Sequence, residues 1–384
     1  MRILLVDQFG EMGGGQRCLL EAAMGFRDRG WDALAAVPAG RFASALEPYC
    51  TEVHNLPCGP FTSGKKSIVD RLRFALQVPV QAAIIARIAS RARADVIFAN
   101  GPRVLLASAL ARGGSPLIYH AHWMPGQALA AKLALRALRW SGASAIAPSA
   151  FAARWLSSAV PLTRIFVVSN GVWGRSTSGG FKTRHAPSPQ LHVAVLGRIS
   201  PEKGQLEFAR AARIVSSQIK GITFTICGAP LFGDQNYFAT VQAEAQKHVQ
   251  FQNWTEDTLS FLQTVDLLVI PSRIDHAPRV ILEAFAAGVP VLAFAVGAIP
   301  ELIEHRRTGL LVHDQTPEAL AQAILAAAGQ PDQLDEIGTR AHALWKERYT
   351  LSRFQSGICD AVETALRRHH QRSPLNSAGA SAAA

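Results

Sequence analysis

Two basic side chains in the second half of the chain, Arg198 and Lys203, follow an apolar run that is predicted to be a buried strand. Gly197 leaves room for a ligand after that strand, and Gly204 opens the next predicted helix. The amides of a helix N-terminus add positive potential to that of the two cations. Together these residues suit a diphosphate, on which negative charge grows as it departs as a leaving group. Each cation taken alone would be typical of an exposed surface residue.

A second group of candidates lies in a segment predicted to be a loop followed by a helix that begins near Pro278. Glu283 stands among apolar neighbours in that helix, where a carboxylate is costly unless a partner hydrogen-bonds it. The two hydroxyls of a ribose would serve as that partner. A solvent-facing glutamate on an amphipathic helix is the alternative. Asp275, eight residues earlier, would reach a sugar lying over the helix N-terminus.

Three consecutive glycines, Gly13, Gly14 and Gly15, follow the first predicted strand and open a helix. They let a ligand approach the backbone closely and aim amide groups at it. Their spacing does not match G-x-G-x-x-G, and Gln16 stands where a Walker A loop needs lysine. A tight turn without a ligand is the alternative.

The segment 59–67, GPFTSGKKS, comes close to a phosphate-binding P-loop. It satisfies G-x-x-x-x-G-K, but Lys66 occupies the Ser/Thr position that would hold magnesium, and the preceding residues make a poor core strand. A basic surface loop is the favoured interpretation.

Short apolar runs alternate with longer helical stretches through the whole chain, a pattern that predicts parallel sheets covered by helices. The alternation restarts after residues 174–190, which are rich in Gly, Ser and Pro and are predicted to be a linker. The runs expected to be strands are 3–7, 33–37, 95–100, 117–122, 144–149 and 165–170, then 192–199, 222–228, 248–254, 266–272, 289–294 and 309–312.

The predicted organisation is therefore α/β, with two doubly wound domains. Residues 1–173 form the first domain and residues 191–349 the second. A C-terminal helix over 350–370 is expected to pack back on the first domain, and residues 371–384 to be a disordered tail.

The net charge of +11 indicates an anionic partner. No zinc-finger spacing or aromatic-basic RNA-binding pattern appears, so we expect no nucleic acid partner. Basic residues concentrate in the first half, beside helical segments that carry Phe74, Leu76, Ile84, Ile85 and Ile88. A basic helix with an apolar face suits an anionic membrane surface, and a solvated face on an ordinary helix is the alternative.

Five scattered cysteines without a C-x-x-C pair argue against a disulfide framework or a zinc site and fit a reducing compartment. The N-terminal residues lack the features of a signal peptide. The apolar stretch 74–86 is too short to span a bilayer and contains Pro79. We expect a cytoplasmic protein without a transmembrane helix, peripheral to the inner face of the membrane.

Three motifs carry a resemblance to a known family. G-R-x-x-x-x-K-G spans 197–204, S-R-x-D-x-x-P-x-x-x-x-E-A-x-A-x-G-x-P-V spans 272–291, and G-x-x-P-E-L-I spans 297–303. The sequence resembles the family-4 retaining glycosyltransferases, and the resemblance covers nearly the whole chain. It implies the GT-B fold, in which two Rossmann-like domains face each other across a ligand-binding cleft.

Carried over by position, the resemblance implies that Arg198 and Lys203 bind the diphosphate of a nucleotide sugar and that Glu283 binds its ribose. The amides after Pro278, from Arg279 and Val280, would also face the diphosphate.

The resemblance also implies that His122 lies near the reacting sugar, with His120 as the alternative and a packed core histidine as a further interpretation of either. Gly13, Gly14 and Gly15 would cup the diphosphate or the acceptor.

Two positions depart from the family pattern. Asp275 stands where the first glutamate of the E-x7-E motif is usual, near the sugar hydroxyls, and its side chain is one methylene shorter. Trp173 stands where an aspartate is common after N-G-V. The first change puts the sugar choice and the turnover rate in question.

The resulting hypothesis is transfer of a glycosyl group from a UDP- or GDP-sugar to a lipid-linked or glycan acceptor, with retention of the anomeric configuration. No D-x-D or His/Cys ligand set appears near these motifs, so neither a metal nor another cofactor is expected. A nucleotide-sugar epimerase of the same fold and a catalytically silent nucleotide-sugar-binding protein are the alternatives.

Overall fold

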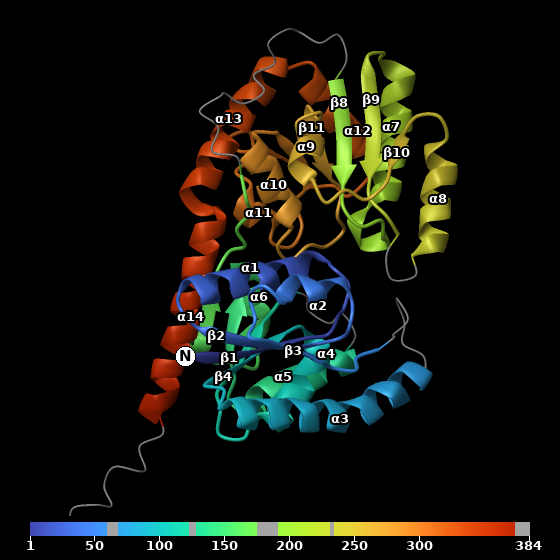
Figure 1. Ribbon diagram of the computed structural model, residues 1–384. Coiled ribbons are helices and arrows are strands. Elements are labelled where there is room, and N and C mark those ends of the chain that lie inside the picture. Colours follow the sequence, from blue (N-terminus) through green and yellow to red (C-terminus); the bar gives the residue numbers. More distant parts are fainter. Residues whose placement is uncertain (60–67, 123–127, 175–190, 231–233, 373–384) are drawn as a thin grey trace, which may run out of the picture. The chain divides into compact units, whose positions relative to one another are not determined.

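The computed structural model describes residues 1–59, 68–122, 128–174, 191–230 and 234–372 (Figure 1). They divide into two compact units. The described residues of the first unit are 1–59, 68–122, 128–169 and 354–372, and those of the second are 170–174, 191–230 and 234–353. Almost all of the predicted linker and tail, and the near-match to a P-loop after Gly59, lie outside the described residues.

The first unit is built on a seven-stranded parallel sheet in the order β3-β2-β1-β4-β5-β6-β7. Its central strands are buried along their length, which is why they are apolar runs rather than alternating patterns. The strands are β1 (Arg2–Asp7), β2 (Asp32–Val37), β3 (Glu52–Asn55), β4 (Val96–Asn100), β5 (Leu117–His120), β6 (Ser144–Ala147) and β7 (Ile165–Val167). Strand β3 is absent from the prediction because, at the sheet edge, its residues are only partly buried.

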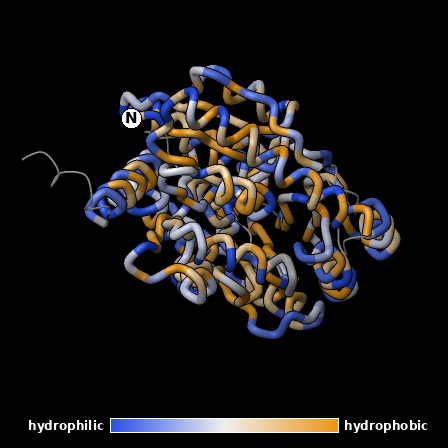
Figure 2. The backbone as a smooth tube through the Cα atoms, turned by 90° about the horizontal axis from the view of Figure 1, so that it is seen from below, coloured by the Kyte–Doolittle hydropathy of each residue, from blue (hydrophilic) through white to orange (hydrophobic). Residues whose placement is uncertain are grey.

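Helices cover both faces of this sheet. Leu4 and Val6 of β1 face a core shared with four helices, and Phe98 of β4 faces Phe26 on the opposite side. The helices are α1 (Gly14–Asp28), α2 (Arg41–Leu46), α3 (Ile68–Ala92), α4 (Pro102–Ala111), α5 (Ala128–Ser141) and α6 (Ala150–Leu156), with α14 (Leu351–Arg372) at the C-terminal end. Hydrophobic and hydrophilic residues alternate along the helical turns at the edge of Figure 2, as expected for helices that cover a core on one side.

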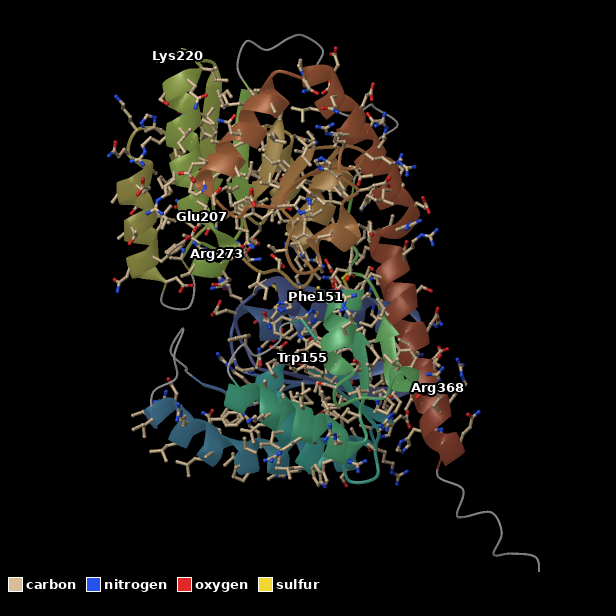
Figure 3. All side chains as sticks on the ribbon, turned by 180° about the vertical axis from the view of Figure 1, so that it is seen from behind. Phe151, Trp155, Glu207, Lys220, Arg273 and Arg368 are labelled. Carbon is tan, nitrogen blue, oxygen red and sulfur yellow. The ribbon has the colours of Figure 1, made fainter. Side chains whose placement is uncertain are left out.

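Helix α14 packs against the first unit from residue 354 onward. Gln355 Nε2 donates to the carbonyl of Glu21 in α1, at 3.1 Å, and Asp360 is paired with Arg29 at 2.5 Å. Further along, the Arg368 guanidinium lies 5.4 Å from the ring centroid of Phe166 in β7 (Figure 3). Side-chain contacts thus join the C-terminal helix both to α1, which follows the first strand of the sheet, and to β7, its last strand.

The second unit contains a six-stranded parallel sheet in the order β10-β9-β8-β11-β12-β13. Its strands are β8 (Leu191–Leu196), β9 (Ile222–Cys227), β10 (Gln250–Gln252), β11 (Leu267–Ile270), β12 (Val291–Phe294) and β13 (Leu310–Val312). Its helices are α7 (Gln205–Gln218), α8 (Gln235–Ala245), α9 (Thr258–Leu262), α10 (Arg279–Ala287), α11 (Ile299–Leu302), α12 (Pro317–Ala328) and α13 (Pro331–Arg348). They form one core around Phe208 of α7 and another around Phe285 of α10.

The α/β class predicted from the sequence is confirmed, because both sheets are parallel and have helices on both faces. In each sheet the strand order reverses beside the first strand of the unit, as in doubly wound folds. The prediction for the stretch 74–86 needs correction: α3 begins at Ile68, includes four arginines, and by length and composition alone is long enough to cross a membrane.

Candidate functional site

Strands β8 and β11 are neighbours at the point where the strand order of the second sheet reverses. Ligands of doubly wound sheets bind beside the carboxyl ends of strands at such a point. The segment Gly197–Gly204 follows β8, and the loop that carries Asp275 follows β11. The topology therefore brings together the two sequence motifs that were predicted to bind a diphosphate and a sugar. We call Gly197, Arg198, Lys203, Asp275 and Glu283 the second-unit site.

Lys203 and Asp275 form an ion pair in this site, with 2.6 Å between Lys203 Nζ and Asp275 Oδ2. The hydroxyl of Ser272 lies 3.4 Å from the same carboxylate oxygen. Asp275 is only 7% exposed, and its carbonyl accepts from the amide of Ala298 at 2.9 Å. Asp275 is therefore fixed both by a backbone hydrogen bond and by the ion pair of its carboxylate with Lys203.

Arg198 is also paired with carboxylates. Its Nη1 lies 2.8 Å from Asp234 Oδ2, and its Nη2 bonds to Glu202. Its carbonyl accepts from Gln205 Nε2 at 2.8 Å, which fixes the backbone between β8 and α7. Arg198 and Lys203, the two predicted diphosphate ligands, are thus each paired with acidic side chains of the same unit, which balance their charge. A phosphate group offers the same kind of charge-assisted bond and could take the place of these carboxylates.

Gly204 determines how the Lys203 turn sits on the rest of the site. Its φ is +71°, and a Cβ atom there would lie 1.8 Å from the carbonyl oxygen of Pro271. Only glycine allows the turn to approach the end of β11 this closely. The closeness of the two segments is what brings Lys203 to Asp275.

Gly204→Ala is expected to destabilise the second unit by about 3 kcal/mol, from a left-handed backbone and a steric clash together. Gly113→Ala is the matched control, because Gly113 also has a positive φ of 54° but open space around its Cβ position. It should cost only about 1 kcal/mol. Chemical denaturation of both variants measures the difference, and equal costs would contradict the close approach described above.

Helix α10 begins directly after Pro278, as predicted, and its apolar residues Ile281, Leu282, Ala284 and Phe285 are buried. Glu283 is half-buried on this helix, and its carboxylate makes no hydrogen bond or ion pair to any residue that the structure describes. The start of the helix is held in place by a neighbouring segment. Asn170 Nδ2 donates to the carbonyl of Ala277 at 3.4 Å, and Arg279 Nη1 donates to that of Gly171 at 3.2 Å.

Trp173, at the position of the second departure, is 59% exposed. The structure gives it no contact within the second-unit site.

A second polar group lies at the corresponding point of the first sheet, where β1 and β4 are neighbours. Asn100, at the end of β4, donates through Nδ2 to Asp7 at the end of β1. Gln16 Nε2 donates to the same carboxylate at 3.0 Å. On its other side, Asn100 Oδ1 lies 2.7 Å from His122 Nε2. We call Asp7, Gln16, Asn100 and His122 the first-unit network.

The network determines which nitrogen of His122 carries hydrogen. An amide oxygen only accepts, and the Asn100 amide nitrogen is directed to Asp7, so His122 Nε2 must be the donor. In the neutral ring, Nδ1 is then the basic nitrogen. A Cβ atom on Gly15 would lie 3.4 Å from the His122 ring, so the glycine-rich segment passes directly beside this histidine.

Burial raises the pKa of the Asp7 carboxyl from 3.8 to about 6, although bonds from Asn100, Gln16 and the amide of Phe9 act against the shift. All of these partners are N–H donors, so they favour the ionised form. The carboxyl is fully buried. The network is therefore sensitive to pH in the range where Asp7 changes charge.

His120, the alternative histidine, lies inside the core. Its ring is fully buried between Phe98 and Phe354, and neither ring nitrogen has a hydrogen-bond partner among the described residues. Burial, with the nearby His122, lowers its pKa well below the usual value. The centroids of the two histidine rings lie 3.9 Å apart, but β5 ends at His120, so His122 stands beyond the strand rather than on its face.

Sequence reasoning missed Asp7, Gln16, Asn100 and Asp234 as parts of these two groups. A signal was present for two of them, because Asp7 and Asn100 each end an apolar strand with a polar side chain. Within the described ranges, no group of three or more His, Cys, Asp or Glu side chains could hold a metal ion. The absence of a metal requirement stays a prediction.

Two families of known proteins match the sequence of this chain. Residues 12–172 match the family described as Glycosyltransferase Family 4, and residues 190–330 match the one described as Glycosyl transferases group 1. Together the two matches cover most of the chain, including every strand of both sheets except β1 and all three resemblance motifs. The chain belongs to the family-4 glycosyltransferases. The resemblance noted in the sequence is confirmed.

Among curated family-4 relatives, a D-inositol 3-phosphate glycosyltransferase of Jonesia denitrificans is 31% identical over 169 residues, 41% of this chain and 40% of the relative. A GDP-mannose-dependent alpha-(1-6)-phosphatidylinositol monomannoside mannosyltransferase of Mycobacterium tuberculosis is 28% identical over 141 residues, 34% of this chain and 37% of the relative. The matched stretches thus span less than half of each of these proteins.

Solved structures match over much more of the chain. The Anabaena protein HepE, crystallised in complex with UDP-glucose, has a TM-score of 0.77 and 26% identity over 95% of this chain and 100% of its own. Sucrose-phosphate synthase from Thermosynechococcus elongatus, at 16% identity, shares the fold with a TM-score of 0.77. This family-4 chain therefore has the GT-B fold.

Proposed function

We propose that the protein transfers a glycosyl group from a UDP- or GDP-sugar to a glycan or lipid-linked acceptor, with retention of the anomeric configuration. The observation that carries the proposal is the Lys203–Asp275 pair beside Arg198 at the reversal point of the second sheet. It combines two cations for a diphosphate with a carboxylate for sugar hydroxyls. The likeness to HepE, which binds UDP-glucose, supports a nucleotide-sugar donor.

In this proposal, the donor diphosphate takes over the cations from their present carboxylate partners. Lys203 and Arg198 stabilise the charge that develops on the departing diphosphate, the role a metal ion has in other transferases. The first-turn amides of α10, from Arg279 and Val280, add positive potential on the same side. No metal ion is then required, and activity should persist in EDTA.

The nucleoside and the sugar are bound by the two carboxylates of the site. Glu283, which has no partner among the described residues, accepts hydrogen bonds from the ribose hydroxyls. Asp275, once Lys203 turns to the diphosphate, accepts from hydroxyls of the transferred sugar. We assign the acceptor to the first unit, with His122 near the reacting sugar and Gly13, Gly14 and Gly15 beside it.

The test is incubation of the purified protein with radiolabelled UDP- and GDP-sugars, with and without lipid extract or glycan acceptors. We expect transfer that depends on an acceptor. NMR should show the same anomeric configuration of the transferred sugar in the product as in the donor. Conversion of the donor sugar without any acceptor would instead identify an epimerase. Binding of donors without turnover under every condition would leave a silent binding protein.

Glu283→Ala is expected to weaken binding of the matching nucleoside diphosphate by about 10- to 100-fold, the usual effect of losing hydrogen bonds to a charged group. Calorimetry measures this without needing an acceptor. Glu318→Ala is the control, because Glu318 is an exposed glutamate of α12 in the same unit. If the two variants bind the nucleotide equally well, Glu283 does not contact the ribose.

A further inference from the structure

Helix α3 exposes large apolar side chains to solvent along its first half. Ile68 is 75% exposed and Leu76 is 72% exposed, and three more apolar residues between Ile68 and Ala83 are similarly open: Val69, Leu72 and Val80. Residues four apart lie above one another on a helix, so Ile68, Leu72 and Leu76 form a continuous stripe. Contiguous exposed apolar surface of this kind marks an interaction site.

The opposite side of the same helix is a conventional core face. Val78, Ile85 and Ile88 are buried in the core of the first unit, where α3 packs on α4. Gln81 Nε2 donates to the carbonyl of Pro57 at 2.7 Å. The helix is therefore fixed to the body of the protein over residues 78–88, which favours a position on the surface of a partner over a bilayer crossing.

This arrangement changes the sequence-based expectation for the apolar face. Ile85 and Ile88, which were expected to contribute to it, belong to the core. The exposed apolar residues all precede them in the helix, and Leu76 is the member of the predicted apolar set that they include.

The charge around the stripe is almost entirely of one sign. Helices α3, α4 and α5, which pack side by side in that order, contain one acidic residue between them, the buried Asp70. Against it stand eight basic residues: Arg71, Arg73, Arg87, Arg91, Arg103, Lys132, Arg136 and Arg139. Trp140, at the end of α5, is 61% exposed. We call the exposed residues of α3 and α5 the basic helical face.

We infer that the basic helical face docks on an anionic lipid bilayer. The apolar stripe of α3 enters the boundary between headgroups and acyl chains, while the exposed arginines of α3 and α5 and Lys132 contact lipid phosphates. A protein partner with a matching apolar strip would not need cations on both α3 and α5. The inference does not depend on the proposed transfer reaction, because it uses no residue of either functional site.

The test is flotation of the full chain with vesicles of phosphatidylcholine alone and with vesicles containing 30% phosphatidylglycerol (a mole fraction of about 0.3, enough for a negative surface potential). We expect binding to the anionic vesicles only, and weakening with added salt. Leu72→Ser/Leu76→Ser should lower partitioning roughly tenfold or more, because two inserted side chains are lost. Arg87→Gln and Arg91→Gln should each lower it roughly fivefold.

The matched control for the apolar pair is Leu162→Ser/Val167→Ser, which alters two exposed apolar residues of the same unit outside the three helices. This variant should bind vesicles like the wild type. Equal binding by the Leu72/Leu76 variant and this control, with thermal unfolding unchanged in both, would overturn the inference. So would loss of a dimer, seen by light scattering, in the Leu72/Leu76 variant alone, because a second copy would then cover the stripe.

Discussion

Replacing Lys203 with alanine is expected to lower kcat for glycosyl transfer by about a thousandfold. The removal of one well-placed group that stabilises developing negative charge typically costs about 10²–10³ in rate. Lys203 also forms an ion pair with Asp275, with 2.6 Å between Nζ and Oδ2. Because Asp275 is only 7% exposed, the loss of Lys203 leaves a buried carboxylate without its paired cation. The measurement is kcat and KM with the donor that the protein is found to use.

Lys220→Ala is the control for this variant. Lys220, labelled in Figure 3, is an exposed lysine of the same unit outside the second-unit site. Its removal changes the net charge by the same amount as removal of Lys203. Its kcat should equal that of the wild type. If kcat of Lys203→Ala falls by less than about tenfold, the loss is too small for the role assigned to this lysine.

The second large effect is expected from Asn100→Leu. Leucine has a similar volume but offers neither the acceptor for His122 nor the donor for Asp7, so both ends of the first-unit network lose their partner. If His122 takes part in proton transfer, kcat should fall by about 10²–10⁴. Binding of the nucleoside diphosphate should stay within about twofold, since its ligands lie in the second unit.

A nitrogen NMR spectrum of His122 separates orientation from simple loss of fold. In the wild type the hydrogen should be on Nε2, whereas in Asn100→Leu the ring should show a mixture of tautomers. Ser108→Ala is the control for a buried polar change in the same unit, because the Ser108 hydroxyl has no partner among the described residues. An Asn100→Leu enzyme with full kcat would remove His122 orientation from the mechanism.

The same network predicts an acid limit to activity. Asp7 is ionised above a pKa of about 6, where it accepts from Asn100 and Gln16; below that pH its added hydrogen is directed at groups that are themselves donors. The rate should therefore fall as the pH decreases through about 6. For stability the sign is opposite: the folded pKa lies above the usual value, so the free energy of unfolding gains from protonation of Asp7 as the pH drops toward 4.

The sequence allowed every strand except β3 to be predicted, and it allowed the two motifs of the second-unit site to be placed at strand ends, because both depend on local patterns. Buried parallel strands are short apolar runs, and Arg198, Lys203 and Asp275 come directly after two of them. Parallel topology then places the carboxyl ends of neighbouring strands at one edge. The helix start at Pro278 was likewise set by residues within a few positions.

What escaped prediction depends on contacts between distant segments. Nothing local in the sequence shows that Asn100 stands between Asp7 and His122, which are 93 and 22 positions away from it. The same holds for Asp234, which meets Arg198 from another strand-to-helix connection. Ile85 and Ile88 of α3 were assigned wrongly because the helix carries apolar residues on more than one side, so periodicity alone could not tell core from surface.

The Lys203–Asp275 pair also bears on how a reaction product would leave. A nucleoside diphosphate held by Lys203 must compete with an anion that the chain itself carries and that, in the absence of ligand, already sits on the same ammonium group. In the proposed reaction, Asp275 pairs with Lys203 again once the sugar has been transferred, and this exchange is expected to lower the affinity for the nucleoside diphosphate product. We therefore expect the Asp275 carboxylate to displace the nucleoside diphosphate product from Lys203. Asp275→Asn, which removes the competing charge, should retain nucleoside diphosphate more tightly than the natural chain does.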